Sequence, residues 1–135
     1  MQTPGYHRRQ MLATPRQGGM TAQRDALISE AQLQATVVGM AELYGWLVHY
    51  TNDSRRGRTG MPDLFLARAL PGRPGVAMAM ELKTEKGQLS KGRLTRTGKW
   101  LPGQVEWLEL LGRCSEFRSG LYRPSDLDSI EEILR

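Results

Sequence analysis

The sequence has 135 residues, of which 39% are hydrophobic and 24% charged, a composition typical of one folded, soluble domain. Its one cysteine excludes an intrachain disulfide and a cysteine-rich zinc site, its two histidines argue against a histidine-rich metal centre, and no apolar run is long enough to span a membrane. The net charge of +5, with 15 arginines among the 19 basic residues, favours nucleic acid as a partner, because a guanidinium group can donate two parallel hydrogen bonds to a phosphate.

The N-terminal segment is rich in Pro, Gly, Gln and Thr, has no acidic residue, and includes Arg8, Arg9 and Arg16. We expect residues 1–22 to form a flexible basic arm that either contacts a nucleic-acid backbone or is simply solvated, with the folded domain over residues 23–135. Because the segment lacks the apolar core of a secretory signal, the cytoplasm is the expected compartment.

The first helix is expected to begin at Ser29, because Ser29 to Gln32 has the form of a capping box, in which two side chains satisfy backbone N–H groups at a helix start. It is predicted to run to about Tyr44 and to end at Gly45. Three residues are predicted on its apolar face: Ala31, Val38 and Ala41.

Three strands follow in the prediction, over residues 46–50, 63–68 and 76–83. The Pro-Gly-Arg-Pro-Gly turn at residues 71–75 is short, so the second and third strands should form an antiparallel hairpin. Residues 84–103 are rich in Gly, Lys, Arg and Thr and are predicted to form a long basic loop, which in a compact domain is usually functional or mobile.

The C-terminal part is predicted to contain a helix from Gly103 to Gly112, a strand over residues 117–122, and a last helix capped by Ser125. The apolar residues of the two helices recur at helical spacing: Val105, Leu108 and Leu111 in the first, and Leu127, Ile130 and Leu134 in the second. The predicted order of helix, three strands, helix, strand and helix is that of an α/β protein.

Three ionisable groups should meet at the open end of the predicted hairpin. Glu81 and Lys83 are two residues apart on one strand and therefore point to the same face. If Arg68 pairs with about Val76, Asp63 lies opposite about Leu82, next to both charged residues; a shift of one residue would turn Asp63 away. Carboxylates in this arrangement suit Mg²⁺ or Mn²⁺, the backbone carbonyl of Leu82 is a further oxygen ligand, and a lysine can orient a water and offset negative charge.

A plainer interpretation is that Glu81 and Lys83 form an ordinary surface ion pair. The third strand argues against it, because residues 77–82 are apolar apart from Glu81, as in a strand that is buried on both faces. A charge at the end of a buried strand needs a compensating role. Pro62 also restricts the backbone where Asp63 emerges.

Two motifs in this region, Gly-Met-Pro-Asp-Leu-Phe at residues 60–65 and Glu-Leu-Lys-Thr-Glu-Lys-Gly at residues 81–87, closely resemble those of the virus-type replication-repair nuclease (VRR-NUC) domain, a branch of the PD-(D/E)xK superfamily. The resemblance runs from about Ser29 to the C-terminus. It implies a restriction-endonuclease-like αβββαβ core with a mixed central sheet flanked by helices, and cleavage of DNA with the help of Mg²⁺ or Mn²⁺.

Carried over by position, the resemblance implies that Asp63 and Glu81 are metal ligands and that Lys83 is the catalytic lysine. Glu30 resembles the additional acidic residue of the family, acting on the metal directly or through water, although a carboxylate here also suits the dipole of the helix. Gln104 resembles the family's helix glutamine near the site, and the alternative is an exposed polar side chain at a helix start.

Several basic residues are predicted to bind DNA: Arg55, Arg56, Arg58, Lys86, Arg93, Arg96 and Lys99. The first three precede the Asp63 motif, Lys86 follows the catalytic lysine, and the others belong to a segment, residues 91–102, that is longer than the family usually has. This segment also contains Trp100, and charge beside a stacking surface is typical of nucleic-acid contacts. Solvated side chains, or a dimer contact in residues 91–102, are the alternatives.

The favoured hypothesis is a metal-dependent, structure-specific DNA endonuclease that resembles Holliday-junction resolvases and acts in phage replication, repair or recombination, in the host cytoplasm. A homodimer is expected, because a two-fold dimer matches a symmetric four-way junction. The alternatives are a nickase, a flap or restriction-like nuclease, or a catalytically silent DNA-binding module, which intact Asp63, Glu81 and Lys83 argue against.

Overall fold

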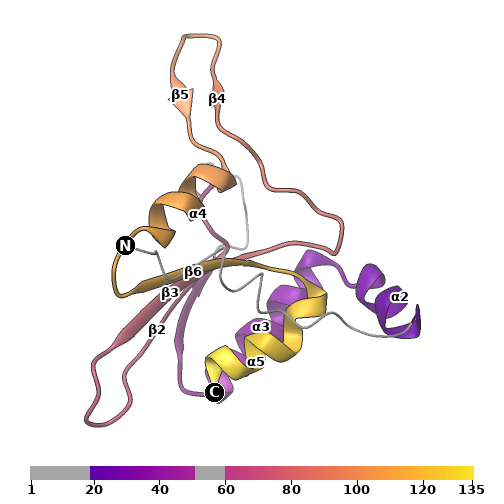
Figure 1. Cartoon of the computed structure of the whole chain (residues 1–135), viewed down its shortest axis with the longest axis vertical. Coiled ribbons are helices and arrows are strands. Elements are labelled where there is room, and N and C mark those ends of the chain that lie inside the picture. The colour runs from indigo at the N-terminus through magenta and orange to yellow at the C-terminus, as the bar shows by residue number, and fades with distance from the viewer. Residues whose placement is uncertain (1–18, 51–59) are drawn as a thin grey trace.

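The computed structural model describes residues 19–50 and 60–135 and centres on a four-stranded mixed sheet (Figure 1). Its strands are β1 (Leu47–Tyr50), β2 (Leu64–Arg68), β3 (Val76–Leu82) and β6 (Phe117–Tyr122), in the order β1-β2-β3-β6. β1 and β3 run antiparallel to β2, and β6 runs parallel to β3. The three predicted strands and the later fourth strand are confirmed to within about one residue at each end.

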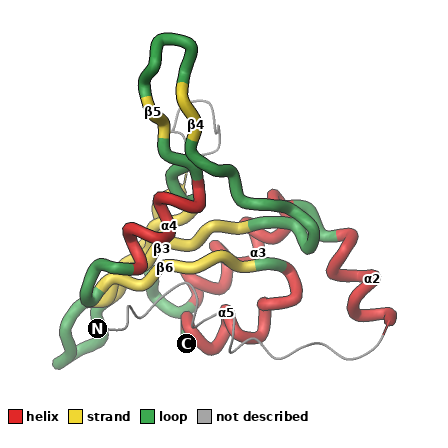
Figure 2. The backbone as a smooth tube through the Cα atoms, turned by 45° about the horizontal axis from the view of Figure 1, so that its top comes forward, coloured by secondary structure: helices red, strands yellow, loops and turns green. Residues whose placement is uncertain are grey.

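Helices cover both faces of this sheet. On one face lie α3 (Glu30–Leu43) and α5 (Leu127–Leu134), the latter preceded by the 3₁₀ turn η1 (Pro124–Asp126), and on the other lies α4 (Gln104–Gly112), as Figures 1 and 2 show. The predicted fold class, a mixed sheet flanked by helices as in restriction endonucleases, is confirmed. None of the helices in the described part of the chain is long and apolar enough to cross a membrane.

The β2–β3 hairpin has the predicted pairing of Arg68 with Val76. Because the register continues to Leu64 opposite Met80, Asp63 comes to lie across from Glu81 and not from Leu82, one residue away from the expectation. This register brings the two carboxyls to the same face, since directly opposed residues of an antiparallel pair share a face. From Met78 to Leu82 every residue of β3 is buried, which confirms that this strand is covered on both sides.

The hydrophobic core lies between the sheet and the α3–α5 layer, with Leu33, Val37, Ile130 and Leu134 fully buried. Arg68 lies at the end of this core where the C-termini of α3 and α5 meet. The Arg68 guanidinium donates hydrogen bonds to the carbonyl oxygens of Tyr44 (3.0 Å), Leu134 (2.9 Å) and Arg135 (3.2 Å), and stacks on the Trp46 ring at 4.4 Å. One side chain therefore satisfies carbonyl groups at the C-terminal ends of both α3 and α5.

The helix starts and ends agree with the sequence patterns in part. Ser29 and Gln32 form the predicted capping box, and Gly45, at φ +84°, follows the end of α3. The predicted apolar face of α3 was wrong in detail: Ala41 is buried, but Ala31 is exposed and Leu33 and Val37 take its place. The predicted Ser125 cap was also wrong, because the 3₁₀ turn moves the N-cap of α5 to Asp126.

Helix α2 and the two short strands β4 and β5 were not predicted. Helix α2 (Gly19–Leu27) begins inside the segment assigned to the arm, and so residues 19–22 are helical; the rest of that segment, with Arg8, Arg9 and Arg16, lies outside the described residues. The expected loop over residues 84–103 contains a short antiparallel hairpin of β4 (Arg93–Leu94) and β5 (Trp100–Leu101), which stands clear of the sheet (Figure 1).

Candidate active site

Glu81 is the most deeply buried charged residue of the candidate site. It is 1% exposed near the end of β3, and its Oε1 accepts a hydrogen bond from Nε2 of Gln104 at 2.9 Å. Its other oxygen, Oε2, is buried and has no hydrogen-bond partner. A buried carboxylate oxygen without a partner is costly, so this position calls for a proton or a cation.

Burial raises the pKa of the Glu81 carboxyl from 4.5 to about 9, and the neighbouring Asp63 carboxyl adds to this rise, while Lys83 opposes it. Without a cation, Glu81 is therefore protonated at neutral pH. A carboxyl whose pKa is shifted this far by burial and by a second carboxyl is a physical indication of a functional site.

Asp63 lies immediately before β2, where the buried Pro62 leads into the strand. Its Oδ2 accepts a hydrogen bond from the backbone N–H of Leu82 at 2.9 Å, which fixes the carboxylate beside the end of β3. The predicted proximity of Asp63 and Glu81 is thus present in the structure.

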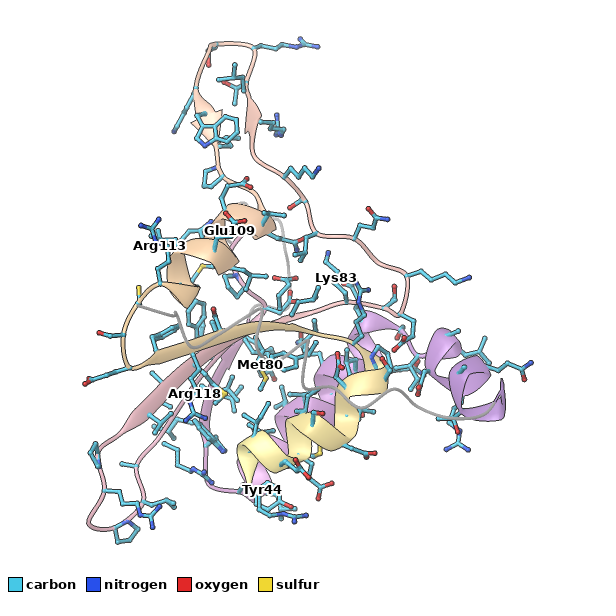
Figure 3. All side chains as sticks on the ribbon, in the orientation of Figure 1. Tyr44, Met80, Lys83, Glu109, Arg113 and Arg118 are labelled. Atoms are coloured by element: carbon cyan, nitrogen blue, oxygen red, sulfur yellow. The ribbon has the colours of Figure 1, made fainter. Side chains whose placement is uncertain are left out.

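Lys83 follows β3 directly, and its side chain is 13% exposed. Nζ lies 4.0 Å from Oε1 of Glu30, the first residue of α3. Figure 3 shows Lys83 beyond the end of the sheet, next to the beginning of α3. The chain therefore brings one lysine and the three carboxyl-bearing residues named in the sequence analysis to one end of the sheet.

Gln104 opens α4 and connects Glu81 to the segment that precedes the β4–β5 hairpin. Its side-chain Oε1 accepts from the backbone N–H of Ser90 at 2.9 Å, while its own backbone N–H donates to Oγ of Ser90 at 3.1 Å. With both ends of the amide engaged, the side chain has one orientation toward Glu81. Gln104 is therefore not the exposed helix-start residue of the alternative interpretation.

The start of α4 sits against two other backbone segments with almost no space between them. A Cβ added to Gly60 would lie 2.5 Å from the carbonyl carbon of Gly103, and a Cβ added to Gly103 would lie 2.5 Å from the carbonyl carbon of Lys91. Gly60 also has φ +81°, a conformation that favours glycine. The loop leading to Asp63 and the helix bearing Gln104 are thereby packed backbone to backbone.

The loop after Lys83 is held in place by Arg123, whose Nη1 donates to the carbonyl oxygens of Thr84, Glu85 and Gly87. The Glu85 carboxylate in turn accepts a hydrogen bond from the backbone N–H of Ser125 at 2.6 Å. Lys86, on the same loop, is exposed. The sequence analysis missed both Arg123 and Ser90, because their partners are distant in sequence or part of an irregular loop, and no local pattern identifies them.

A groove of about 600 Å³ lies beside the carboxyls, between the outer face of α3 and the β1–β2 edge. Small and polar residues of α3 form much of its wall. Its lining residues are Glu30, Ala31, Gln34, Ala35, Val38, Tyr50 and Asp63.

The donor set fits a hard divalent cation in a limited way. Asp63 and Glu81 supply carboxylate oxygens, one of which, Glu81 Oε2, is buried and lacks any other partner. In the described residues, however, no group of three or more His, Cys, Asp and Glu side chains is close enough to hold a metal ion together. Glu30 instead lies beside Lys83, so two carboxylates, backbone oxygen and water are the ligands that such an ion would find here.

Apart from Lys86, which is exposed on the loop after Lys83, the predicted DNA-contacting residues divide into two groups. Arg93, Arg96 and Lys99 are exposed in the β4–β5 hairpin, Arg93 on β4 and the other two between the strands. Arg55, Arg56 and Arg58 lie outside the described residues.

The family model for the VRR-NUC domain matches residues 23–121. A search of curated proteins and a search of solved structures each found no match. Since the family match spans most of the chain and includes Asp63, Glu81, Lys83 and Gln104, the protein belongs to the VRR-NUC domain family and is a nuclease of the PD-(D/E)xK type, with DNA as its substrate.

Proposed function

We propose that this protein is a divalent-metal-dependent endonuclease that cuts branched DNA, such as a four-way junction, during phage replication, repair or recombination. The observation that carries the proposal is the buried, unpartnered Oε2 of Glu81, beside Asp63 and two residues from Lys83 in the chain. Surface ion pairs do not require such burial, and a purely DNA-binding module has no use for two adjoining carboxyls near a phosphate.

The catalytic roles follow from the positions of the side chains. Asp63 and Glu81 are proposed as the metal ligands, with the Leu82 carbonyl as a third. Glu30 is proposed to act through water, because it lies 4.0 Å from Lys83 and no three carboxylates of the described residues gather closely enough to share an ion. These groups would hold Mg²⁺ or Mn²⁺, which would supply Lewis-acid chemistry, polarising the scissile phosphate and lowering the pKa of a bound water.

The remaining residues orient the reacting groups. Lys83, mostly buried, is placed to hold the attacking water and to offset negative charge that develops on the phosphate. Gln104 holds the Glu81 carboxylate in one orientation through its hydrogen bond to Oε1. Lys86 and the exposed arginines and lysine near the hairpin are proposed to contact the DNA backbone, together with Arg55, Arg56 and Arg58.

The choice of a branched substrate rests on two observations. The groove of about 600 Å³ lies beside Asp63, and the basic hairpin projects away from the sheet, so that two arms of DNA could be held at once. A homodimer with two-fold symmetry would present two such sites to a four-way junction.

The experiment is a cleavage panel of linear, nicked, flap and four-way-junction DNAs with Mg²⁺, with Mn²⁺ and with EDTA. We expect the wild-type protein to cut junctions by paired incisions only when metal is present. Glu81→Gln and Lys83→Met should bind DNA normally and fail to cut it. A matched control, Glu109→Gln, alters an exposed carboxylate on α4 and should cut like the wild type.

The outcomes separate the alternatives. Single incisions would identify a nickase, and preference for a flap or for one linear sequence would identify a flap or restriction-like enzyme. Cleavage in EDTA, or full activity of Glu81→Gln, would refute the metal site. A sedimentation mass near 15.2 kDa during paired incision would refute the homodimer.

A further inference from the structure

The β4–β5 hairpin, defined as residues 91–102, is the most strongly basic segment of the described chain that projects from the fold. It contains four basic residues and no acidic one: Lys91, Arg93, Arg96 and Lys99. Figures 1 and 3 show it projecting away from the sheet beyond the start of α4, with its side chains extending into solvent. Such a projection has no role in the hydrophobic core, so its shape and charge need another explanation.

The tip of the hairpin is well ordered by its own hydrogen bonds. The N–H of Gly98 donates to the carbonyl of Thr95 at 3.0 Å, the N–H of Thr95 donates to the carbonyl of Lys99 at 2.8 Å, and the N–H of Lys99 donates to the Thr95 hydroxyl at 3.0 Å. Gly98 has φ +81°, as the turn requires. The hairpin therefore presents its side chains in a defined arrangement before anything binds.

One side of the hairpin carries a large apolar surface. Trp100 is 55% exposed and lies opposite Leu94, which is 66% exposed. The indole of Trp100 covers Gly92 so closely that a Cβ on that residue would overlap the benzene ring. One part of the ring is thus supported by backbone while the rest faces solvent, which is the arrangement of a stacking platform.

The base of the hairpin is connected to the candidate catalytic carboxyl by a short series of hydrogen bonds. Ser90 immediately precedes the hairpin and bonds to Gln104 in both directions, and Gln104 bonds to Glu81. The N–H of Gly103, just after the hairpin, donates to Oε1 of Glu106 at 2.9 Å. The hairpin therefore starts directly after Ser90 and ends two residues before Gln104, so that both of its ends lie next to the Ser90–Gln104 pair that contacts Glu81.

We infer that the hairpin recognises DNA structure, with Trp100 stacking on an unpaired base at a branch point or strand end while its basic residues hold the adjoining phosphates. The inference rests on the proposed nuclease function and deepens it by naming the feature of the substrate that is read. Aromatic stacking accepts any base, and four positive charges suit a nucleic-acid backbone. A second copy of the chain is a poorer occupant, because two such hairpins would repel each other.

The test measures binding in EDTA, so that cleavage does not interfere. Fluorescence anisotropy gives the affinity of the wild-type protein for a blunt duplex and for a forked duplex with two unpaired arms, and 2-aminopurine at the fork reports stacking. In Trp100→Ala we expect the ratio of forked to duplex affinity to fall about 10-fold and the 2-aminopurine quenching to disappear, as loss of one base–aromatic stack predicts. Trp100→Phe should restore most of both signals.

The control is Leu110→Ala, which removes a similarly exposed apolar side chain from α4 and should retain the wild-type ratio. Thermal unfolding of each variant verifies that the fold is intact. An unchanged ratio in Trp100→Ala overturns this inference and leaves the nuclease proposal standing. A change in the sedimentation mass of Trp100→Ala would have the same consequence, because the hairpin would then be a dimer contact. A wild-type protein that binds neither DNA overturns both.

Discussion

Replacing Glu81 by glutamine removes the ionisable group at the centre of the site while keeping the size of the side chain and an oxygen for Gln104 to donate to. In the metal-free wild type, the pKa of Glu81 is about 9 in the folded state against 4.5 for an ordinary glutamate. The folded protein therefore holds a proton that the unfolded chain releases between these values. The contribution of this group to stability is therefore greatest below pH 4.5, falls as the pH rises toward 9, and levels off above it.

The size of the effect follows from the shift. Each pH unit inside this window lowers the unfolding free energy by about 1.4 kcal/mol. Raising the pH from about 5 to about 7.5 should therefore lower the unfolding free energy of the wild type by about 3 kcal/mol through this one group. Glu81→Gln has no proton to lose and should lack this part of the pH dependence. At neutral pH the variant is expected to be more stable than the metal-free wild type.

The assay is urea unfolding in EDTA at several pH values between 5 and 8.5, with Glu109→Gln as the control because its carboxylate is exposed. Adding Mn²⁺ to the wild type should restore stability, and more strongly at the higher pH, because the cation takes the place of the proton. Equal pH slopes in the wild type and in Glu81→Gln would refute the reasoning, since the buried carboxyl would then be titrating normally.

Three further predictions concern the residues that hold the site and the fold together. Gln104→Ala should lower kcat or the affinity for Mn²⁺ by about 10- to 100-fold, measured by cleavage and by metal titration, because it frees the Glu81 carboxylate. Arg123→Met should loosen the loop that follows Lys83, which amide hydrogen exchange at residues 84–87 would detect as faster exchange. Arg68→Met should lower the unfolding free energy by about 3 kcal/mol in urea titrations, because three helix-end carbonyls lose their donor; a loss below about 1 kcal/mol would show that water replaces it.

The parts of the fold that were predicted correctly depend on strong local signals. The apolar run ending at Glu81 and the Pro-Gly turn at residues 71–75 identify the central hairpin, and the Ser29 capping box identifies the start of α3. The proximity of the Asp63 and Glu81 carboxyls could be predicted from these signals alone, because the pairing of two strands follows from the turn and the register. The error of one residue at Asp63 shows the limit of that approach.

The parts that were missed depend on contacts between distant segments. Strands β4 and β5 have only two residues each, too few for a periodic pattern, and their pairing depends on the Thr95–Gly98 turn. Arg123 binds a loop nearly 40 residues earlier in the chain. The Ser90–Gln104 pair likewise joins a loop to a helix start, and neither residue type indicates its partner.

The close approach of Gly60, Lys91 and Gly103 limits which substitutions the nuclease centre can accept. Three stretches of main chain meet where even a methyl group has no room. The distance between the loop that leads to Asp63 and the start of α4 is therefore determined by direct contact between backbones. Evolution or engineering can vary the hairpin beyond this junction in length and charge, while the junction itself admits almost no change. New DNA preferences are therefore expected to arise through replacement of residues 92–101, with the hydrolytic machinery left in register.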